Sequence, residues 1–344
     1  MSRFIQKIIY LAFSLFILYC AVWYGWGVYA KKMLHDALNS FDKYEVTTDK
    51  IELSGFPFNL SYTLRNLSIV DKGKDVQYTI NLGNPILKSN FSLGSFVMEI
   101  NDDISISTSN NKNNYVVSYN KGASLSTRLK NSIGYSMIQG NSKPLNIRDV
   151  SKFEYLDHGY SIKDTILEKV IFTSSKNDLD LKVTGDSLSD FTSIAANFNG
   201  EGSEGFYIQG PLTLNASFDV KTIFDEKNLN RQIKGLVFNF GKFAFLAQGY
   251  SLDISGNLSV MGSDNDSTGV VAVKLNNVPK FLNTVEQFYS PKQTDYLKGL
   301  IFKMSGVAVD QPLENMDIEI KGENKDIKFG HATMVDLVLY SLRK

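Results

Sequence analysis

The sequence is poor in the residues that form covalent cross-links and metal sites. Among 344 residues it has one cysteine, Cys20, and three histidines, His35, His158 and His331. A disulfide within the chain is excluded, and so is a zinc site of the His/Cys type, because no two of these residues have metal-ligand spacing. The soluble part must be stabilised by an ordinary apolar core. We expect no metal and no other cofactor.

The chain also lacks an excess of charge of either sign. It contains 36 basic and 36 acidic residues, which gives a formal net charge of zero. A protein that binds nucleic acid through its overall charge needs a basic surplus. Nucleic acid is therefore not an expected partner.

Motifs that identify a chemical reaction are missing as well. The sequence has no glycine-rich phosphate loop and no nucleophile elbow. Asp157 beside His158 is the pair that suggests acid–base catalysis, but adjacent residues in a turn need not face the same site. We therefore expect no catalytic residue and no enzymatic activity.

Long apolar runs are scarce, with a single example near the N-terminus. Ile8 to Ala30 comprises 23 residues without a charge, and a helix rising about 1.5 Å per residue over that length crosses a bilayer core of about 30 Å. A cleavable signal has a shorter apolar region of about 7–15 residues, so we interpret the run as a retained anchor, with cleavage after Ala30 as the alternative. The positive start at Arg3 and Lys7 predicts that the N-terminus stays inside and the body lies across the membrane.

Aromatic and basic residues crowd the C-terminal end of this run, where amphipathic rings suit the headgroup layer and lysines reach the surface. The predicted membrane-interface residues are Trp23, Tyr24, Trp26, Tyr29, Lys31 and Lys32. Apolar residues continue at helical spacing from Met33 to Phe41, so we expect the helix to extend outside the membrane.

Beyond residue 43 the apolar residues recur mainly with a period of two. Leu60, Tyr62 and Leu64 alternate with polar residues, and the longest alternation runs over 212–220. This pattern predicts antiparallel strands with one apolar and one solvated face.

Two helical stretches interrupt the strands. Spacing over 188–198 predicts one helix, with Asp186 and Ser187 as possible caps. A second is expected over 278–288, capped by Asn277, stopped by Pro291 and resumed near Tyr296.

The expected fold is mainly β (α+β): a single N-terminal transmembrane helix followed by a long curved antiparallel sheet with a few packed helices. The polar segment 139–149 suggests a boundary inside the body. We therefore divide the chain into an anchor and membrane-proximal helix over 1–43, an N-terminal β region over 44–144 and a C-terminal β region with helices over 145–344.

One short motif carries a family resemblance. Gly55, Phe56, Pro57 and Phe58 precede an alternating strand over 59–65, after one anchor and a short amphipathic helix. This arrangement resembles the bacterial envelope family called "domain of unknown function 2125". Residues 249–258 and 269–273 resemble that family's C-terminal strands, whereas 337–344 lack its closing pattern. The motif suits a structural corner, since proline has no donor and belongs where a strand begins, and direct ligand contact is the alternative.

The layout is also similar to that of AsmA-like envelope proteins, which pair one anchor with a long curved sheet and are linked to lipid transport. The resemblance implies an inner-membrane location, a body in the periplasm and a role in envelope maintenance. Two functions are open: a groove that binds or guides membrane lipid, and a non-catalytic interaction module that docks another envelope protein.

Overall fold

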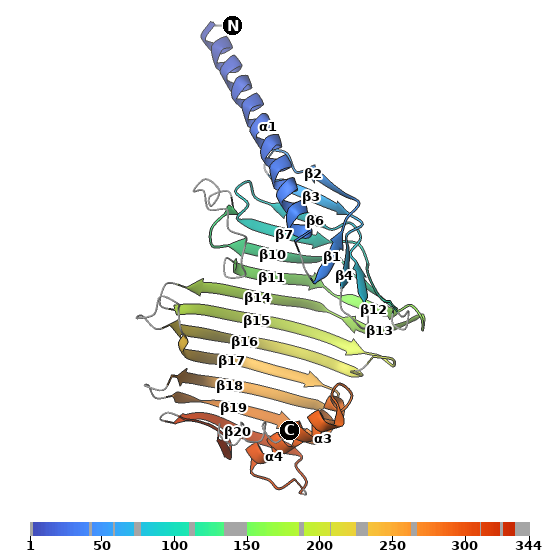
Figure 1. Ribbon diagram of the computed structural model, residues 1–344, viewed down its shortest axis with the longest axis vertical. Helices are drawn as coiled ribbons and strands as arrows, with labels where there is room; N and C mark the ends of the chain where they lie inside the picture. The colour runs from blue at the N-terminus through green and yellow to red at the C-terminus, as the bar shows by residue number, and fades with distance from the viewer. Residues whose placement is uncertain are drawn as a thin grey trace. The chain divides into compact units, whose positions relative to one another are not determined.

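The computed structural model describes residues 3–40, 43–57, 59–71, 77–109, 114–133, 150–185, 189–206, 208–224, 233–262, 267–309, 311–323 and 326–333. These residues form mostly antiparallel strands, with three α-helices among them (Figure 1). The expected mainly β fold with an N-terminal apolar helix is confirmed.

The chain divides into two compact units. Unit 1 comprises residues 1–150 and 162–169, and unit 2 comprises residues 151–161 and 170–344. The expected boundary at 144/145, within the polar segment 139–149, lies outside the described residues. Each unit is described separately below.

The first element of unit 1 is a long helix, α1 (Arg3–Leu38). It runs without a break past the end of the uncharged run, so the expected continuation beyond Lys31 is confirmed. By length and composition its part Phe13–Leu38 can cross a membrane.

Short strands in two antiparallel ladders make up the rest of unit 1. One ladder has the order β2-β3-β6-β7-β10 and the other has the order β1-β4-β5-β8-β9. Their bounds are β1 (Tyr44–Thr47), β2 (Lys50–Ser54), β3 (Leu60–Arg65), β4 (Ser68–Asp71), β5 (Tyr78–Asn81), β6 (Ile86–Ser89), β7 (Ser95–Ile100), β8 (Ile104–Thr108), β9 (Asn114–Tyr119) and β10 (Ala123–Leu129).

The core of unit 1 forms where α1 packs on the first ladder. The predicted alternation in β3 is confirmed, because Leu60, Tyr62 and Leu64 are all buried on one face. Trp23 and Ala30 of α1 pack into the same cluster. The sheet-facing stripe of α1 thus belongs to the core of this unit.

Unit 2 contains most of β11 (Val150–His158) and β13 (Lys169–Ser174), and a meander of longer strands follows them. Strand β12 (Tyr160–Asp164) has residues 160–161 in unit 2 and residues 162–164 in unit 1. From β14 to β19 each strand pairs with the next one in the sequence, β11 joins at β14, and β20 joins at β19 (Figure 1). The remaining bounds are β14 (Lys176–Gly185), β15 (Ser189–Gly202), β16 (Gly210–Phe224), β17 (Ile233–Ala247), β18 (Tyr250–Met261), β19 (Thr268–Asn276), β20 (Asn315–Glu323), β21 (Asp326–Phe329) and β22 (Ala332–Thr333).

The helix predicted over 188–198 is wrong, because residues 189–198 lie in strand β15. Its apolar residues fit both periods, and Ile194, Ala196 and Phe198 share one face of the strand. The strand forms because β14 and β16 flank it and satisfy its backbone groups. The suggested caps, Asp186 and Ser187, lie outside the described residues.

Two helices, α3 (Val278–Val285) and α4 (Pro291–Ser305), lie between β19 and β20. The Asn277 side chain caps α3 by accepting a hydrogen bond from the backbone N–H of Lys280, as predicted. Pro291 opens α4 instead of stopping a helix, because Ser290 and Gln293 form a capping box immediately around it.

Candidate functional site

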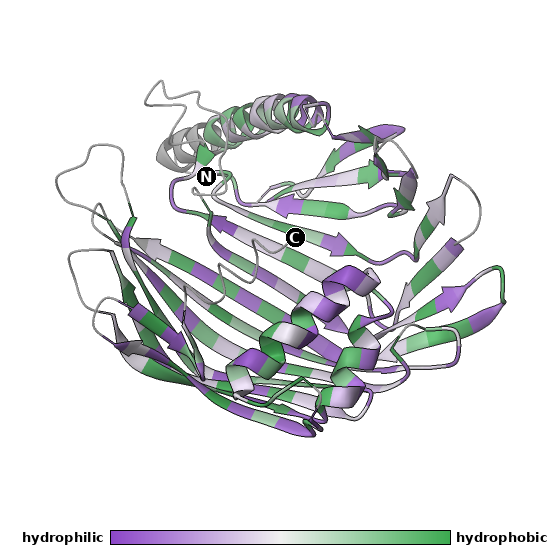
Figure 2. Cartoon of the chain, turned by 60° about the horizontal axis from the view of Figure 1, so that its bottom comes forward, coloured by the Kyte–Doolittle hydropathy of each residue, from purple (hydrophilic) through white to green (hydrophobic). Residues whose placement is uncertain are grey.

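The strongest candidate site is one face of the unit 2 sheet. Because side chains alternate along a strand, residues paired across neighbouring strands share a face. Ile194, Phe218 and Phe240 are register partners across three strands. The set that shares this side, here called the apolar face, is Leu179, Leu181, Ile194, Ala196, Phe198, Leu212, Leu214, Ala216, Phe218, Val220, Phe238, Phe240, Phe243, Phe245, Leu252, Ile254, Leu258, Val271, Val273, Leu275, Met316, Ile318 and Ile320. In Figure 2, apolar and polar residues alternate along these strands.

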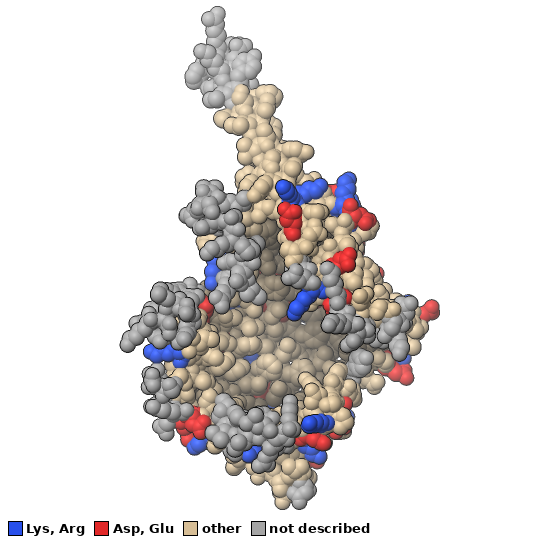
Figure 3. Space-filling view, viewed as in Figure 1, with Lys and Arg blue, Asp and Glu red and all other residues tan. Residues whose placement is uncertain are grey.

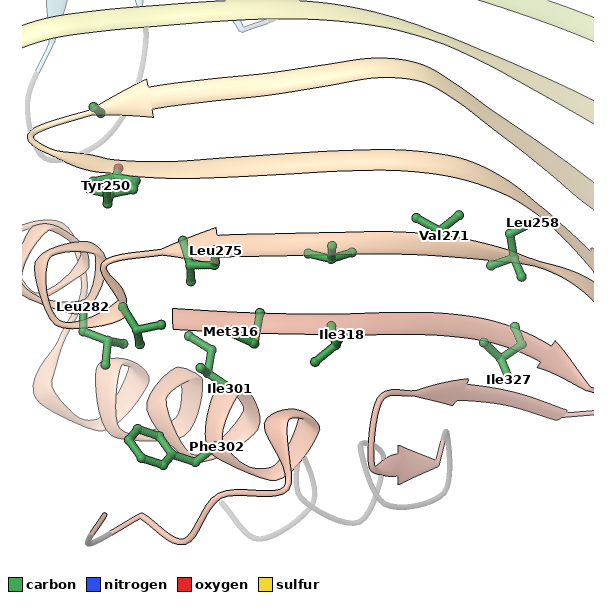
Figure 4. Close-up of a cluster of buried hydrophobic side chains, with 13 residues drawn as sticks. Tyr250, Leu258, Val271, Leu275, Leu282, Ile301, Phe302, Met316, Ile318 and Ile327 are labelled. Atoms are coloured by element: carbon green, nitrogen blue, oxygen red, sulfur yellow. The ribbon is translucent and has the colours of Figure 1, made fainter. Parts of the chain in front are cut away.

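The C-terminal end of the apolar face is covered by helices. Val278 and Leu282 of α3, and Ile301 and Phe302 of α4, pack with the β18–β20 side chains into one buried cluster. In Figure 4, Leu282 and Ile301 of the helices lie beside Leu275 and Met316 of the strands. This part of the face is an ordinary core.

Further along, over β14–β17, the apolar face is only partly buried. Phe218, Phe238 and Phe240 each keep part of their surface exposed, and their rings stack at centroid separations of 5.8 and 6.3 Å. The two described helices of unit 2, α3 and α4, pack into the buried cluster at the other end of the face. Figure 3 shows a hollowed region of the surface over these strands that is lined by uncharged residues.

The opposite face of the same strands is polar. Asn197 donates to Asp178, and Asn215 donates to Asn197, so that a chain of hydrogen bonds crosses β14, β15 and β16. Such a ladder suits a face in contact with water. Polar and charged side chains therefore project from the side of the sheet opposite the apolar face.

A β-bulge keeps the phenylalanines of β17 on the apolar face. The register shifts between Phe240 and Phe243, where Gly241 and Lys242 together oppose one residue of β16. Sequence reasoning did not identify β17, because its apolar residues change phase there. The signal that could have identified β17 is a pair of alternating apolar runs that are offset by one residue. The first run ends at Phe240, and the second starts at Phe243.

One edge of the apolar face ends in an aromatic cluster. The Phe172 ring stacks on Phe198 at a centroid distance of 5.9 Å and contacts Phe206 at 4.8 Å. Phe172 is buried, and a Cβ at Gly200 would lie 2.2 Å from its ring. The cluster is therefore tightly packed around the Phe172 ring.

The predicted membrane-interface residues have two different environments. Trp23 is buried against the sheet of unit 1, whereas Tyr24 points outward and is 64% exposed. Trp26 donates to the Phe91 carbonyl oxygen at 2.8 Å and stacks on Tyr29, whose ring remains exposed. The helix thus has one face in the protein and one outside it. Lys31 is partly exposed and Lys32 is exposed, both on this same helix.

The Gly55, Phe56 and Pro57 motif forms the turn between β2 and β3. Gly55 has φ +94°, and its carbonyl accepts a hydrogen bond from the Asn59 N–H. A Cβ there would lie 2.6 Å from the Asn59 carbonyl oxygen, so the turn requires glycine. Phe58, the fourth motif residue, lies outside the described residues.

Asp157 and His158 form no arrangement suited to acid–base chemistry. The Asp157 carboxylate is fully buried and accepts hydrogen bonds from Tyr155, the Gly159 N–H and the Asn177 amide. His158, the next residue on the strand, is exposed. The carboxylate is therefore committed to structural bonds.

Two buried tyrosines have perturbed acidity. Burial raises the pKa of Tyr62 to about 12, and burial also raises the pKa of Tyr250. The Tyr62 hydroxyl donates to the Gly27 carbonyl oxygen of α1 at 3.2 Å. Both groups are neutral at physiological pH and support packing.

Within the described part of the chain, no group of three or more His, Cys, Asp and Glu side chains is placed to hold a metal ion. No protein-family model, curated protein or solved structure matches this chain.

Proposed function

We propose that this protein is a single-pass inner-membrane protein with its body in the periplasm, where it maintains the cell envelope by binding or guiding lipid along the apolar face. The observation that carries the proposal is the partly exposed stretch of that face over β14–β17. The apolar α1 helix supports the anchor.

The size of the apolar face suits an acyl chain. Seven neighbouring strands, β14 to β20, at about 4.8 Å spacing give a sheet roughly 29 Å wide. One acyl chain spans about half of a 30 Å bilayer core, or roughly 15 Å. Even with its β18–β20 end covered by helices, the face has room for such a chain.

Energetics favour a path that lipid can enter and leave. Each methylene kept out of water is worth about 0.8 kcal/mol, so a lipid that follows the apolar face avoids most of the cost of crossing water. Relative to the bilayer interior, however, the face offers a similar apolar environment. The net affinity is therefore modest, as transfer requires.

A photocrosslinking experiment on the full-length protein in its native membrane tests this proposal. Phe238, which projects from the apolar face, is replaced by the aromatic photocrosslinking amino acid p-benzoylphenylalanine. The matched control carries the same analogue at Asn239, the next residue of β17, which projects from the polar face. We expect a phospholipid adduct from position 238 and none from position 239.

Other outcomes separate the two functions. A protein adduct at position 238, without lipid, would support an interaction module that docks another envelope protein. Equal lipid labelling at both positions would mean that the apolar face has no special role. Purified variants are compared by circular dichroism to confirm that each keeps its strand content.

A further inference from the structure

The turn between β2 and β3 lies against the apolar part of α1. The Phe56 ring is 6.3 Å from the rings of Phe16 and Tyr19 and 5.2 Å from Trp23, between centroids. The Tyr19 hydroxyl also donates to the carbonyl oxygen of Pro57. Even so, Phe56 is 45% exposed.

If α1 spans the membrane, the position of these contacts along α1 determines how deep the turn lies in the hydrocarbon core. A hydrocarbon core of about 30 Å corresponds to 20 helical residues. Even when the core begins at Phe4, directly after Arg3, it reaches Trp23. All three helix residues that contact Phe56 then lie within the core, and the middle one, Tyr19, is about 6 Å beneath its outer boundary.

A second tip lies slightly further out on the same helix. Phe91, between β6 and β7, is 38% exposed, and its carbonyl oxygen accepts the hydrogen bond from Trp26. Trp26 is three residues beyond Trp23, or about 4.5 Å along the axis. Phe91 therefore lies at the boundary between acyl chains and headgroups.

Two carbonyl groups in the backbone of the first tip have hydrogen-bond partners within the protein. Pro57 has no N–H, its carbonyl accepts from Tyr19, and the Gly55 carbonyl accepts from Asn59. In hydrocarbon every unsatisfied backbone group costs several kcal/mol, so these bonds lower the cost of immersion.

Charged residues stop short of both tips. No charge lies between Glu52 and Arg65 or between Lys88 and Glu99 in the sequence. The flanking residues pair across the strands, Arg65 with Glu52 at 2.8 Å and Lys88 with Glu99 at 2.5 Å. The uncharged ends of the strands thus meet the apolar helix, and the charges remain further away.

We propose that the two tips dip into the membrane leaflet on the side of the body, with Phe56 among the acyl chains and Phe91 at the headgroup boundary. The inference rests on the proposed anchor function of α1. The partner is phospholipid of the same membrane, and the exposed side of α1 continues directly into both tips. Unit 1 then begins inside the leaflet, so lipid can reach its strands without entering water.

Spin-label accessibility in proteoliposomes of phosphatidylethanolamine and phosphatidylglycerol tests the depth of each tip. The full-length chain, with Cys20→Ser to remove its native thiol, receives one label through Phe56→Cys, Phe91→Cys or Lys121→Cys. Oxygen partitions into the acyl chains, whereas a nickel chelate stays in water. Lys121 precedes β10 at the end that pairs with Ile100, which is the end of β7 away from Phe91.

We expect the Phe56→Cys label to be relaxed mainly by oxygen and the Lys121→Cys label mainly by the chelate, with the Phe91→Cys label between them. A Phe56→Cys label as accessible to the chelate as the Lys121→Cys label would overturn the inference. Labelling at Phe91 keeps the test valid if the Phe56 substitution perturbs the turn, and circular dichroism reports the fold of each variant.

A fourth label separates this inference from the anchor function. Phe13 is 62% exposed on α1 and lies near the middle of the hydrocarbon core when the core begins at Phe4 and ends at Trp23. A Phe13→Cys label in hydrocarbon with a Phe56→Cys label in water would leave the anchor intact and reject the immersed tip. A Phe13→Cys label in water would reject the anchor itself.

Discussion

Two glycines of α1 give a matched test of how the helix is held on the sheet. A Cβ at Gly27 would lie 2.7 Å from a methyl carbon of Leu53 and 3.3 Å from one of Leu60, whereas a Cβ at Gly25 would meet nothing within 4 Å. Both positions are in the same helix, two residues apart. We compare Gly27→Leu with Gly25→Leu.

The expected difference in the free energy of unfolding between the two variants follows from two opposing effects. Replacing glycine by leucine in a helix interior gains up to about 1 kcal/mol of helix propensity, and this gain cancels in the comparison. Overpacking of a filled contact costs about 1–3 kcal/mol. Gly27→Leu should therefore be less stable than Gly25→Leu by about 1–3 kcal/mol, because only residue 27 faces a filled contact.

Tryptophan fluorescence provides a selective assay. The chain has two tryptophans, Trp23 and Trp26. Both lie where α1 contacts the strands and loops of unit 1. The full chain is unfolded by guanidinium in detergent while the fluorescence emission of these two tryptophans is recorded. The unfolding midpoint then reports the stability of the contact between α1 and the sheet. Equal midpoints for the two leucine variants would refute the close approach of α1 to the sheet.

Three further predictions concern single side chains. Tyr62 remains neutral to higher pH in the folded state than in the unfolded state, so its contribution to stability should be constant below pH 10 and be lost as pH rises toward about 12; a Tyr62→Phe variant should lose part of this decline in alkaline unfolding curves, and an unchanged decline would contradict the assignment. Asp157→Ala should cost roughly 1–3 kcal/mol in denaturant unfolding because it leaves buried donors without an acceptor, and a neutral result would refute that role. Gly256→Ala should cost about 1–3 kcal/mol by thermal unfolding, because the residue has φ +116° and a Cβ would lie 2.3 Å from the Val270 carbonyl oxygen; an unchanged midpoint would argue against this conformation.

Local pattern predicted several of the strands, among them the long strand β16, but failed where two periods coincide. The alternation of β3 and β16 has a single interpretation, and both strands form as expected. In β15, Phe191 and Ala195 extend a helical stripe, whereas Ile194, Ala196 and Phe198 fit a strand. Pairing with both neighbouring strands decides the outcome, and such pairing is a tertiary effect.

The candidate site was predictable only in part. A one-sided apolar sheet follows from the alternation, but its extent depends on the β17 bulge and on how far α3 and α4 reach, and neither is a local property. Likewise, the sequence placed Trp23 at the headgroup layer. That location stays a prediction, and the structure adds that the ring packs on Phe56, a partner 33 residues away in the chain that no spacing rule connects to it.

The sequential strand order of unit 2 has a consequence for assembly. Since each strand from β14 to β19 pairs with its immediate successor, most contacts close short loops, and short loops cost little entropy to close. The sheet can therefore grow one strand at a time along the chain. Gaining or losing one hairpin would change the width of the sheet by about 10 Å and leave the remaining register intact, so the width of the apolar face is set simply by the number of strands.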